Sequence, residues 1–337
     1  MNRDHILSIL LEKSTGGWHW WNWHFDMEMR GHRTPFLDNL IRTILAIDAV
    51  MPGYAERMAS TLGSIKGQEK DKNQYEQLIQ NCAEILVVNH TTCAAWPSNT
   101  RFEDEPTAPG SPKNPELAVW APNLSLGVEV KAAALLAHAR QRNQRTTQAG
   151  GRILPIEKLA SLAGGPEHLI LPRDNPVKDF LESATKKFGA FKSQHPGFLG
   201  VLVVVWDDFM FEPITSILHP LSGLFTEKSF AREPDGSRLK FPHVDAVIVT
   251  NHQFQLRRAM GEDDVRIPYD VAPYAFDWET NLTRAAAYIP CPDGQGLPED
   301  VKARFNAYSI DGTKLADYEP VDWVHWIELR RSPHNKS

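Results

Sequence analysis

The sequence predicts an α/β fold, in which helices flank a central β-sheet. Three observations favour this fold: apolar residues at helical spacing near the N-terminus, a segment with apolar residues at every second position, and two continuous apolar runs rich in valine. Helix, patterned strand, helix and buried strands follow one another in an order that is typical of layered α/β domains. The same order argues against a helix bundle and against a sandwich of antiparallel sheets.

Two helices are predicted in the N-terminal third. The first follows Pro35, a residue suited to a first helical turn, and its apolar stripe is Leu37, Leu40, Ile41, Ile44 and Leu45. The second follows the polar run Gly67–Gln74, and its stripe is Tyr75, Leu78, Ile79, Cys82, Ala83 and Leu86. We expect the polar run to separate a helical, Trp-rich extension, residues 1–72, from the main domain.

A strand is predicted from Leu124 to Lys131, because its residues alternate between two faces. One face carries Leu124, Leu126, Val128 and Val130, and the other carries Gly127, Glu129 and Lys131. This pattern predicts a strand that is half buried, with the charged residues on the wet side.

A further helix and two buried strands complete the expected core. Asn175 and Pro176 are suited to the N-cap and first turn of that helix. Phe198–Trp206 is a continuous apolar run and predicts a central strand covered on both faces, and Val244–Val249 predicts a shorter one. We expect a core over residues 73–260 with a basic insertion at 132–174, and an acidic, irregular extension with a disordered tail over 261–337.

Composition limits the classes of function. The 337 residues include 36 Lys and Arg against 42 Asp and Glu, a net charge of −6, so any nucleic-acid site must be a local patch. Three cysteines without a CxxC pair argue against a disulfide framework and a cysteine-rich zinc module. With neither a signal peptide nor an apolar span at the N-terminus, we expect a cytoplasmic protein with no membrane partner. Motifs of P-loop enzymes, Rossmann dehydrogenases, α/β-hydrolases and HExxH metalloproteases are absent from the sequence.

The constellation that carries chemistry is Glu116, which follows Pro115, together with Glu129 and Lys131. We expect a strand-turn-strand to join them and to bring two carboxylates and one ammonium to one sheet edge. Carboxylate oxygens are suited to hold Mg²⁺, which lowers the pKa of an attacking water and stabilises charge on a phosphate. An ammonium beside them can orient the water or neutralise the transition state.

An acidic residue two positions before a lysine is a weak signal by itself. The other instance, Asp300-Val301-Lys302, follows Pro298 and is typical of a helix start. Glu129-Val130-Lys131 instead lies on the predicted strand. The alternative interpretation is an exposed edge strand that carries a Glu and a Lys on its wet face.

With its motif Asn114–Lys131, the chain resembles the PD-(D/E)XK nuclease superfamily from Tyr75 to about Thr250. The resemblance implies a restriction-endonuclease-like core, in which a mixed central sheet is flanked by helices and a helix precedes the hairpin that carries the motif. It also implies that Glu116 and Glu129 bind Mg²⁺, for which Mn²⁺ substitutes, and that Lys131 is catalytic. Glu116 stands where the superfamily more often has Asp. Glu84 is the candidate for a further acidic residue from the preceding helix.

We therefore expect a Mg²⁺-dependent DNA endonuclease that hydrolyses phosphodiester bonds, in a restriction or anti-phage defence setting. The expected partners are DNA and either a second copy of the chain or a partner defence protein. One alternative is a non-catalytic module on the same fold that binds nucleic acid or protein. Another is a structural subunit that dimerises through its tryptophans.

Two further groups of residues are candidates for contacts. Arg140, Arg142 and Arg145 follow the motif strand, and Lys187 lies on the predicted helix after Pro176; all four are candidates for binding nucleic acid. The alternative for the arginines is a solvated loop, and for Lys187 a side chain directed into solvent. The aromatic cluster from Trp18 to Phe25 is interpreted as packing or an oligomer interface, with stacking on bases as the alternative.

Overall fold

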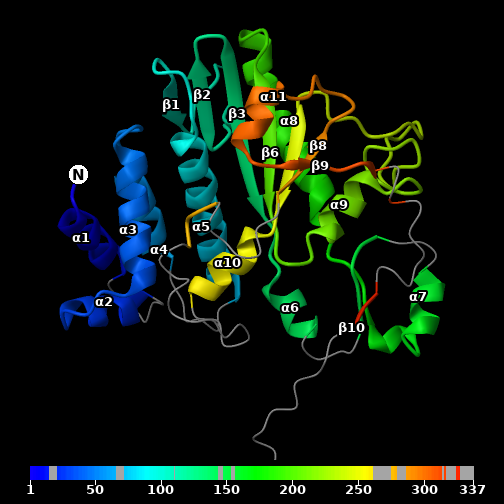
Figure 1. The fold of residues 1–337 in the computed structure, drawn as a ribbon, viewed down its shortest axis with the longest axis horizontal. Coiled ribbons are helices and arrows are strands. Elements are labelled where there is room, and N and C mark those ends of the chain that lie inside the picture. The colour runs from blue at the N-terminus through cyan, green and yellow to red at the C-terminus, as the bar shows by residue number, and fades with distance from the viewer. Residues whose placement is uncertain are drawn as a thin grey trace, which may run out of the picture. The chain divides into compact units, whose positions relative to one another are not determined.

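The computed structural model describes residues 1–14, 21–65, 72–109, 111–142, 147–152, 156–260, 275–278, 286–312, 315 and 324–326 (Figure 1). The chain forms two compact units. The first comprises Met1–Ala133, Phe180–Asp208 and Phe241–Ser309, and the second comprises Ala134–Asp179, Phe209–Lys240 and Ile310–Ser337.

The first unit opens with helices, as the sequence predicts for residues 1–72. They are α1 (Arg3–Ser14), α2 (Trp21–Met29), α3 (Pro35–Asp48) and α4 (Tyr54–Ser64), and α5 (Lys72–Cys93) follows. The helix predicted after Pro35 is confirmed as α3. Helices α1 and α4 approach closely at Gly63, where a Cβ would lie 2.8 Å from Cβ of Lys13. A small residue is therefore needed there for the two helices to pack.

The centre of the first unit is a mixed seven-stranded sheet. Its strands, in spatial order, are β1 (Arg101–Asp104), β2 (Leu117–Ala121), β3 (Leu124–Ala132), β6 (Leu199–Val205), β7 (Ala246–Thr250), β8 (Ala286–Pro290) and β9 (Tyr308–Ser309). Strands β1, β2 and β3 form an antiparallel meander, whereas β6 is parallel to β3 and β7 is parallel to β6. Strand β8 is antiparallel to β7, and β9 is parallel to β8. The α/β class and the central position of the predicted strand 198–206 are confirmed.

Helix α8 (Pro176–Gln194) begins at Pro176, as predicted, and packs on the sheet through Leu181, Ala184, Phe188 and Phe191, which are buried. Its approach depends on glycines in the strands: a Cβ on Gly127 would lie 3.0 Å from the ring of Phe188. Figure 1 shows α5 and α8 running beside the sheet. Both helices bring charged side chains to the same hairpin, as described below.

Two sequence predictions about the first unit are wrong. Strand β3 is covered on both faces, since Gly127 and Glu129 are buried together with Leu126 and Val128. The reason is that α8 covers the face that sequence alternation assigns to solvent. The C-terminal extension is not irregular throughout, because β8, α11 (Glu299–Arg304) and β9 lie within it and two of these elements extend the sheet. These elements are two to six residues long, too short to show a periodic signal.

The second unit begins at Ala134, close to the start of the basic insertion predicted at 132–174. It contains a three-stranded sheet in the order β10 (Val324–Trp326), β4 (Thr147–Ala149) and β5 (Leu169–Ile170). Its helices include α6 (Leu136–Arg142), α7 (Ile156–Leu162) and α9 (Phe211–Leu218).

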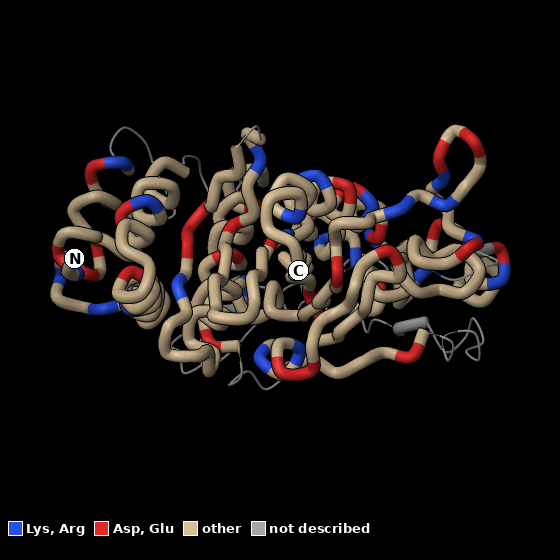
Figure 2. The backbone as a smooth tube through the Cα atoms, turned by 90° about the horizontal axis from the view of Figure 1, so that it is seen from above, with Lys and Arg blue, Asp and Glu red and all other residues tan. Residues whose placement is uncertain are grey.

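Charge is mixed along the chain. Figure 2 shows Lys and Arg interspersed with Asp and Glu along the described backbone, in keeping with the modest net charge. Among the helices in the described ranges, none combines the length and apolar character that crossing a bilayer requires.

Candidate active site

The β2–β3 hairpin places the two predicted carboxylates side by side. Leu117 of β2 pairs with Val128 of β3, so one step further along this antiparallel register Glu116 stands opposite Glu129. Directly opposed residues share a face of the sheet, and like charges in that position repel. The backbone N–H of Val130 donates a hydrogen bond of 3.0 Å to Oε2 of Glu116 and fixes its carboxylate beside the strand.

Two lysines offset this repulsion. Lys131 lies two residues beyond Glu129 and therefore on the same face, and its Nζ is 2.6 Å from Oε1 of Glu129. Nζ of Lys187 on α8 lies 2.7 Å from Oε1 of Glu129 and 3.4 Å from Oε1 of Glu116. The ammonium of Lys187 thus bridges both carboxylates. The alternative that its side chain is directed into solvent is therefore wrong. The sequence of the hairpin gave no indication of this bridge.

Burial makes the electrostatics of this group strong. The side chain of Glu129 is 0% exposed, and those of Glu116 and Lys187 are each 17% exposed. Burial and the adjacent Glu116 raise the pKa of Glu129. The pKa of Glu116 is lowered despite its burial, because it shares a hydrogen bond with Glu129 and lies near Lys187 and Lys131. Because the two carboxyl groups interact this strongly, they titrate as a pair and not as independent groups.

A second charged group adjoins the first. Arg57 of α4 forms a short ion pair with Glu84 of α5, with 2.9 Å between Nη2 and Oε1. The same guanidinium binds Asp104 at the end of β1 through two contacts, 2.5 Å from Nε and 2.6 Å from Nη2. Burial raises the pKa of Glu84 to about 7, an effect that Arg57 opposes and that Glu116 reinforces. Glu84 therefore lies near the hairpin carboxylates, but its charge is already paired.

The predicted catalytic residues are thus brought together, whereas the predicted DNA-contacting arginines have different environments. Arg140 is exposed, but Arg142 is buried, with its guanidinium carbon 4.1 Å from the ring centre of Phe209. The expectation that Arg142 presents a free surface charge is therefore wrong, because the side chain packs within the second unit. Arg145 lies outside the described residues.

The aromatic cluster predicted as packing or an interface is described only from Trp21 onward. His24 and Phe25 are buried, and Nδ1 of His24 lies 2.6 Å from Oγ1 of Thr34. Trp23, by contrast, is 53% exposed. Packing is therefore confirmed for His24 and Phe25, and Trp18 lies outside the described residues.

Sequence reasoning missed Arg57 and Asp104. Neither residue belongs to a recognisable motif, and they are 47 positions apart. Their pairing depends on where α4 and β1 lie in space. Arg57 shares its helix face with Tyr54, Ser60 and Thr61, so the pattern of α4 gave no signal that would single it out.

The donor set of the hairpin fits Mg²⁺. Oε1 of Glu129 is buried and receives no aligned hydrogen bond, although two ammonium groups lie within ion-pair distance of it. The Oε1 oxygen of Glu129 therefore interacts mainly with positive charge, here the ammonium groups of Lys131 and Lys187. Within the described ranges no three His, Cys, Asp or Glu residues form a metal cage. A pair of carboxylates nevertheless suits Mg²⁺, which usually keeps several waters and adds phosphate oxygens as ligands.

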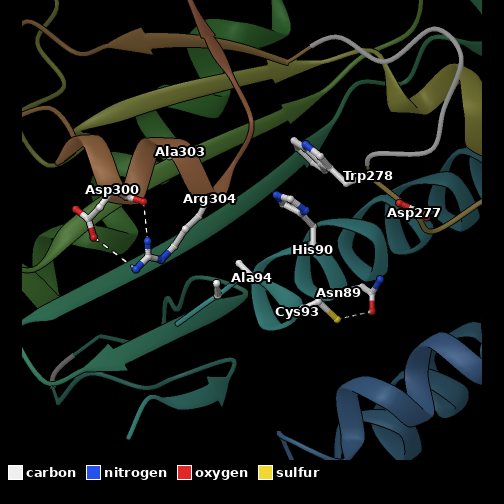
Figure 3. Close-up of a pocket in the computed structure, with 10 residues that line it drawn as sticks. Asn89, His90, Cys93, Ala94, Asp277, Trp278, Asp300, Ala303 and Arg304 are labelled. Atoms are coloured by element: carbon white, nitrogen blue, oxygen red, sulfur yellow. Dashed lines mark hydrogen bonds and ion pairs between the residues drawn. The ribbon is translucent and has the colours of Figure 1, made fainter. Parts of the chain in front are cut away.

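A cavity of about 710 Å³ in the first unit is another place where a small molecule could bind (Figure 3). Its wall includes Trp278, whose ring stacks with His90 and His252 at centroid distances of 4.4 and 4.6 Å. Arg304 donates a hydrogen bond of 2.6 Å to the carbonyl of Asp300. Nε2 of His90 and Nε of Arg304 are nevertheless buried without a hydrogen-bond partner among the described residues. No residue of the predicted catalytic set lines the cavity.

The second unit contains a buried polar cluster of its own. Glu212 has a fully buried side chain, which lies 3.3 Å from Nε2 of His138 and accepts a hydrogen bond of 3.0 Å from Gln148. His138 also lines a cavity of about 350 Å³ whose other walls are mostly apolar. These contacts account for burial of the carboxylate without a ligand.

Comparisons with known proteins give no further assignment. No family model, curated protein or solved structure matches the chain.

Proposed function

We propose that this protein is a Mg²⁺-dependent DNA endonuclease that hydrolyses phosphodiester bonds. The observation that carries the proposal is the convergence of Glu116, Glu129, Lys131 and Lys187 on one face of the β2–β3 hairpin. A buried pair of opposed carboxylates is unfavourable for folding and is compensated here by two ammonium groups. Such an arrangement is typical of a site that binds a cation and a phosphate, and strained charge of this kind is concentrated at functional sites.

The topology supports a restriction-endonuclease-like core. A helix, α5, precedes the antiparallel meander β1–β2–β3, and α8 then leads to β6, which lies parallel to β3. Glu116 directly precedes β2, and Glu129 and Lys131 lie on β3. This is the order that the PD-(D/E)XK resemblance implies. One of the three segments of the second compact unit, Ala134–Asp179, follows β3 and runs into α8.

The residues divide the chemistry among them. Glu116 and Glu129 would hold Mg²⁺ through their carboxylate oxygens. Bound Mg²⁺ would lower the pKa of the attacking water and neutralise charge on the scissile phosphate. Lys131, whose side chain is 24% exposed, can donate a hydrogen bond to that water or to a phosphate oxygen and stabilise the charge that develops during attack.

Lys187 has a separate role in this scheme. Its ammonium bridges the two carboxylates when no metal is bound, and it would be free to contact a phosphate once a metal balances their charge. We propose a restriction or anti-phage defence setting, with DNA as the partner and Mn²⁺ able to replace Mg²⁺. The setting, the DNA partner and the replacement by Mn²⁺ all follow from the superfamily resemblance.

A plasmid assay tests the proposal. Supercoiled DNA should be cleaved with Mg²⁺ and left intact with EDTA. Glu129→Gln keeps the size of the side chain but removes the charge that holds the metal, and Lys131→Ala removes a donor to the transition state, so each should reduce the cleavage rate about a hundredfold or more.

The chain offers a matched control in its second acid-x-lysine tripeptide. Lys302 on α11 pairs at the surface with Glu299, so Lys302→Ala should cleave at the wild-type rate. Full cleavage by Glu129→Gln would overturn the assignment. DNA binding without cleavage by the wild-type protein would favour a non-catalytic binding module instead.

A further inference from the structure

Arg57 links the N-terminal helices to the candidate active site. It lies on α4, in the part of the chain that precedes the nuclease-like order of elements, yet its guanidinium contacts carboxylates of α5 and β1. The side chain is 26% exposed, and that of Glu84 is 16% exposed. An ion pair this enclosed cannot be exchanged for water at low cost.

The guanidinium is oriented by several groups at once. Two of its nitrogens bind the carboxylate of Asp104, a two-point contact that fixes the plane of the arginine. Nη1 lies 3.6 Å from Oε1 of Glu105, and the guanidinium carbon is 5.1 Å from the ring centre of Tyr54. These contacts fix the guanidinium of Arg57, and the carboxylate of Glu84 is held in turn by its ion pair with that guanidinium.

Glu84 lies close to the base of the hairpin. Gln80, one helical turn before it on α5, donates a hydrogen bond of 3.5 Å to the carbonyl of Ala132 on β3. Asp104, which shares the guanidinium of Arg57 with Glu84, stands opposite Leu117, the residue after Glu116. Without Arg57, Glu84 would be an unpaired carboxylate near Glu116. A third carboxylate would strengthen cation binding, because more negative ligands raise affinity for a hard divalent ion. With Arg57 in place, the charge of Glu84 is balanced by the guanidinium, and Oε1 of Glu84 is occupied by that ion pair.

We propose that Arg57 is a positioning residue that keeps Glu84 out of the metal-binding set, so that Glu116 and Glu129 alone provide the protein carboxylates. The inference rests on the proposed function and deepens it, because it assigns to the N-terminal helices a part in setting the affinity of the site for divalent cations. Glu84, which sequence reasoning places among the catalytic residues, is then a partner of Arg57 and not a ligand.

Calorimetric titration of the full-length protein with Mn²⁺, without DNA, tests this inference. Glu84→Gln should bind Mn²⁺ with the stoichiometry and affinity of the wild type. Arg57→Gln should bind it about tenfold more tightly or take up a second ion, because Glu84 is released. The double variant Arg57→Gln, Glu84→Gln should return to wild-type binding.

Each alternative outcome is informative. A loss of Mn²⁺ affinity in Glu84→Gln alone would show that Glu84 is already a ligand and would overturn the inference, even if Arg57→Gln fails to fold. Unchanged binding by a folded Arg57→Gln would also overturn it. Arg57→Lys keeps one positive charge, and we expect it to stay close to the wild type.

Failure of the proposed function gives a different result. In that case the wild-type protein would bind no Mn²⁺, or Glu129→Gln would bind it as well as the wild type, and the inference about Arg57 would fall with the function. If Mn²⁺ binding is lost in Glu129→Gln but unchanged in Arg57→Gln, the inference about Arg57 is rejected and the proposed function stands.

Discussion

At the scale of single residues, the candidate site is a balance of charges in a poorly solvated place. Glu116 and Glu129 stand opposite each other because of strand register, and Lys131 and Lys187 compensate them from β3 and α8. Removing one member of such a group leaves an uncompensated charge that costs more than the interaction itself contributed. The two lysine ammonium groups therefore stabilise the fold, in addition to their proposed roles in catalysis.

This balance predicts how Lys187 and a divalent cation substitute for each other. Lys187→Met should lower the free energy of unfolding by about 3 kcal/mol without divalent ions, because the bridge between the carboxylates is lost. Addition of Mg²⁺ should raise the melting temperature more in this variant than in the wild type, since an ion that binds the native state restores the missing charge. Thermal unfolding with and without Mg²⁺ measures both effects.

Lys186 provides the control for that experiment, because it is the exposed neighbour of Lys187 on the same helix. Lys186→Met should show the stability and the Mg²⁺ response of the wild type. An equal response to Mg²⁺ in Lys187→Met and the wild type would mean that the ammonium does not stand where a metal binds.

At the scale of elements, α8 and the parallel strands determine the geometry of the hairpin. The helix reaches the sheet over glycines, so that Lys187 can extend to the carboxylates while Phe188 packs beneath it. At Gly200 of β6, an added Cβ would meet the ring of Phe188 and lie 2.6 Å from the carbonyl oxygen of His243. The ring belongs to α8 and the carbonyl to the segment before β7, so relief of the clash would displace one of these elements.

Gly200→Ala should therefore be strongly destabilising, by about 3 kcal/mol, because overpacking of this kind forces the backbone to shift. Gly197→Ala is the comparison: its Cβ would meet nothing within 4 Å, but its φ of +85° is strained for any other residue. We expect it to cost about 1–2 kcal/mol. Denaturant unfolding should rank the two variants in this order, and the reverse order would contradict the packing described for α8.

At the scale of the whole molecule, the net charge limits how the protein can bind DNA. A chain with net charge −6 must bind phosphates through local groups. In the second unit, Arg140 is exposed and Arg142 is buried over Phe209. The two arginines, although only two positions apart on one helix, should therefore respond differently to substitution.

Arg142→Ala should lower the melting temperature, because its side chain is lost from a packed environment, at a cost of about 1–2 kcal/mol. Arg140→Ala should leave the melting temperature unchanged and, if Arg140 contacts DNA, reduce the slope of log affinity against log salt by about 0.9. Binding is measured with Ca²⁺ in place of Mg²⁺ to prevent cleavage. An unchanged slope for Arg140→Ala would exclude it from the DNA-binding surface.

Sequence by itself determined the elements whose signal is local. Each of these signals lies within about ten residues. They are the alternation from Leu124 to Lys131, the valine-rich run before Trp206 and the helix starts at Pro35 and Pro176. The structure confirms all four elements. The pairing of Glu116 with Glu129 was predictable for the same reason, since a short hairpin leaves few registers open.

Tertiary structure alone decided which distant charges meet. Lys187 is 58 positions from Glu129, and Arg57 is 27 positions from Glu84. It also decided that α8 buries the charged face of β3, that β8 and β9 extend the sheet, and that Arg142 is buried. A periodic pattern reports which face of an element is apolar, but not which element covers it. An ion pair between separate elements leaves no pattern in either of them, so its existence follows from packing and not from spacing.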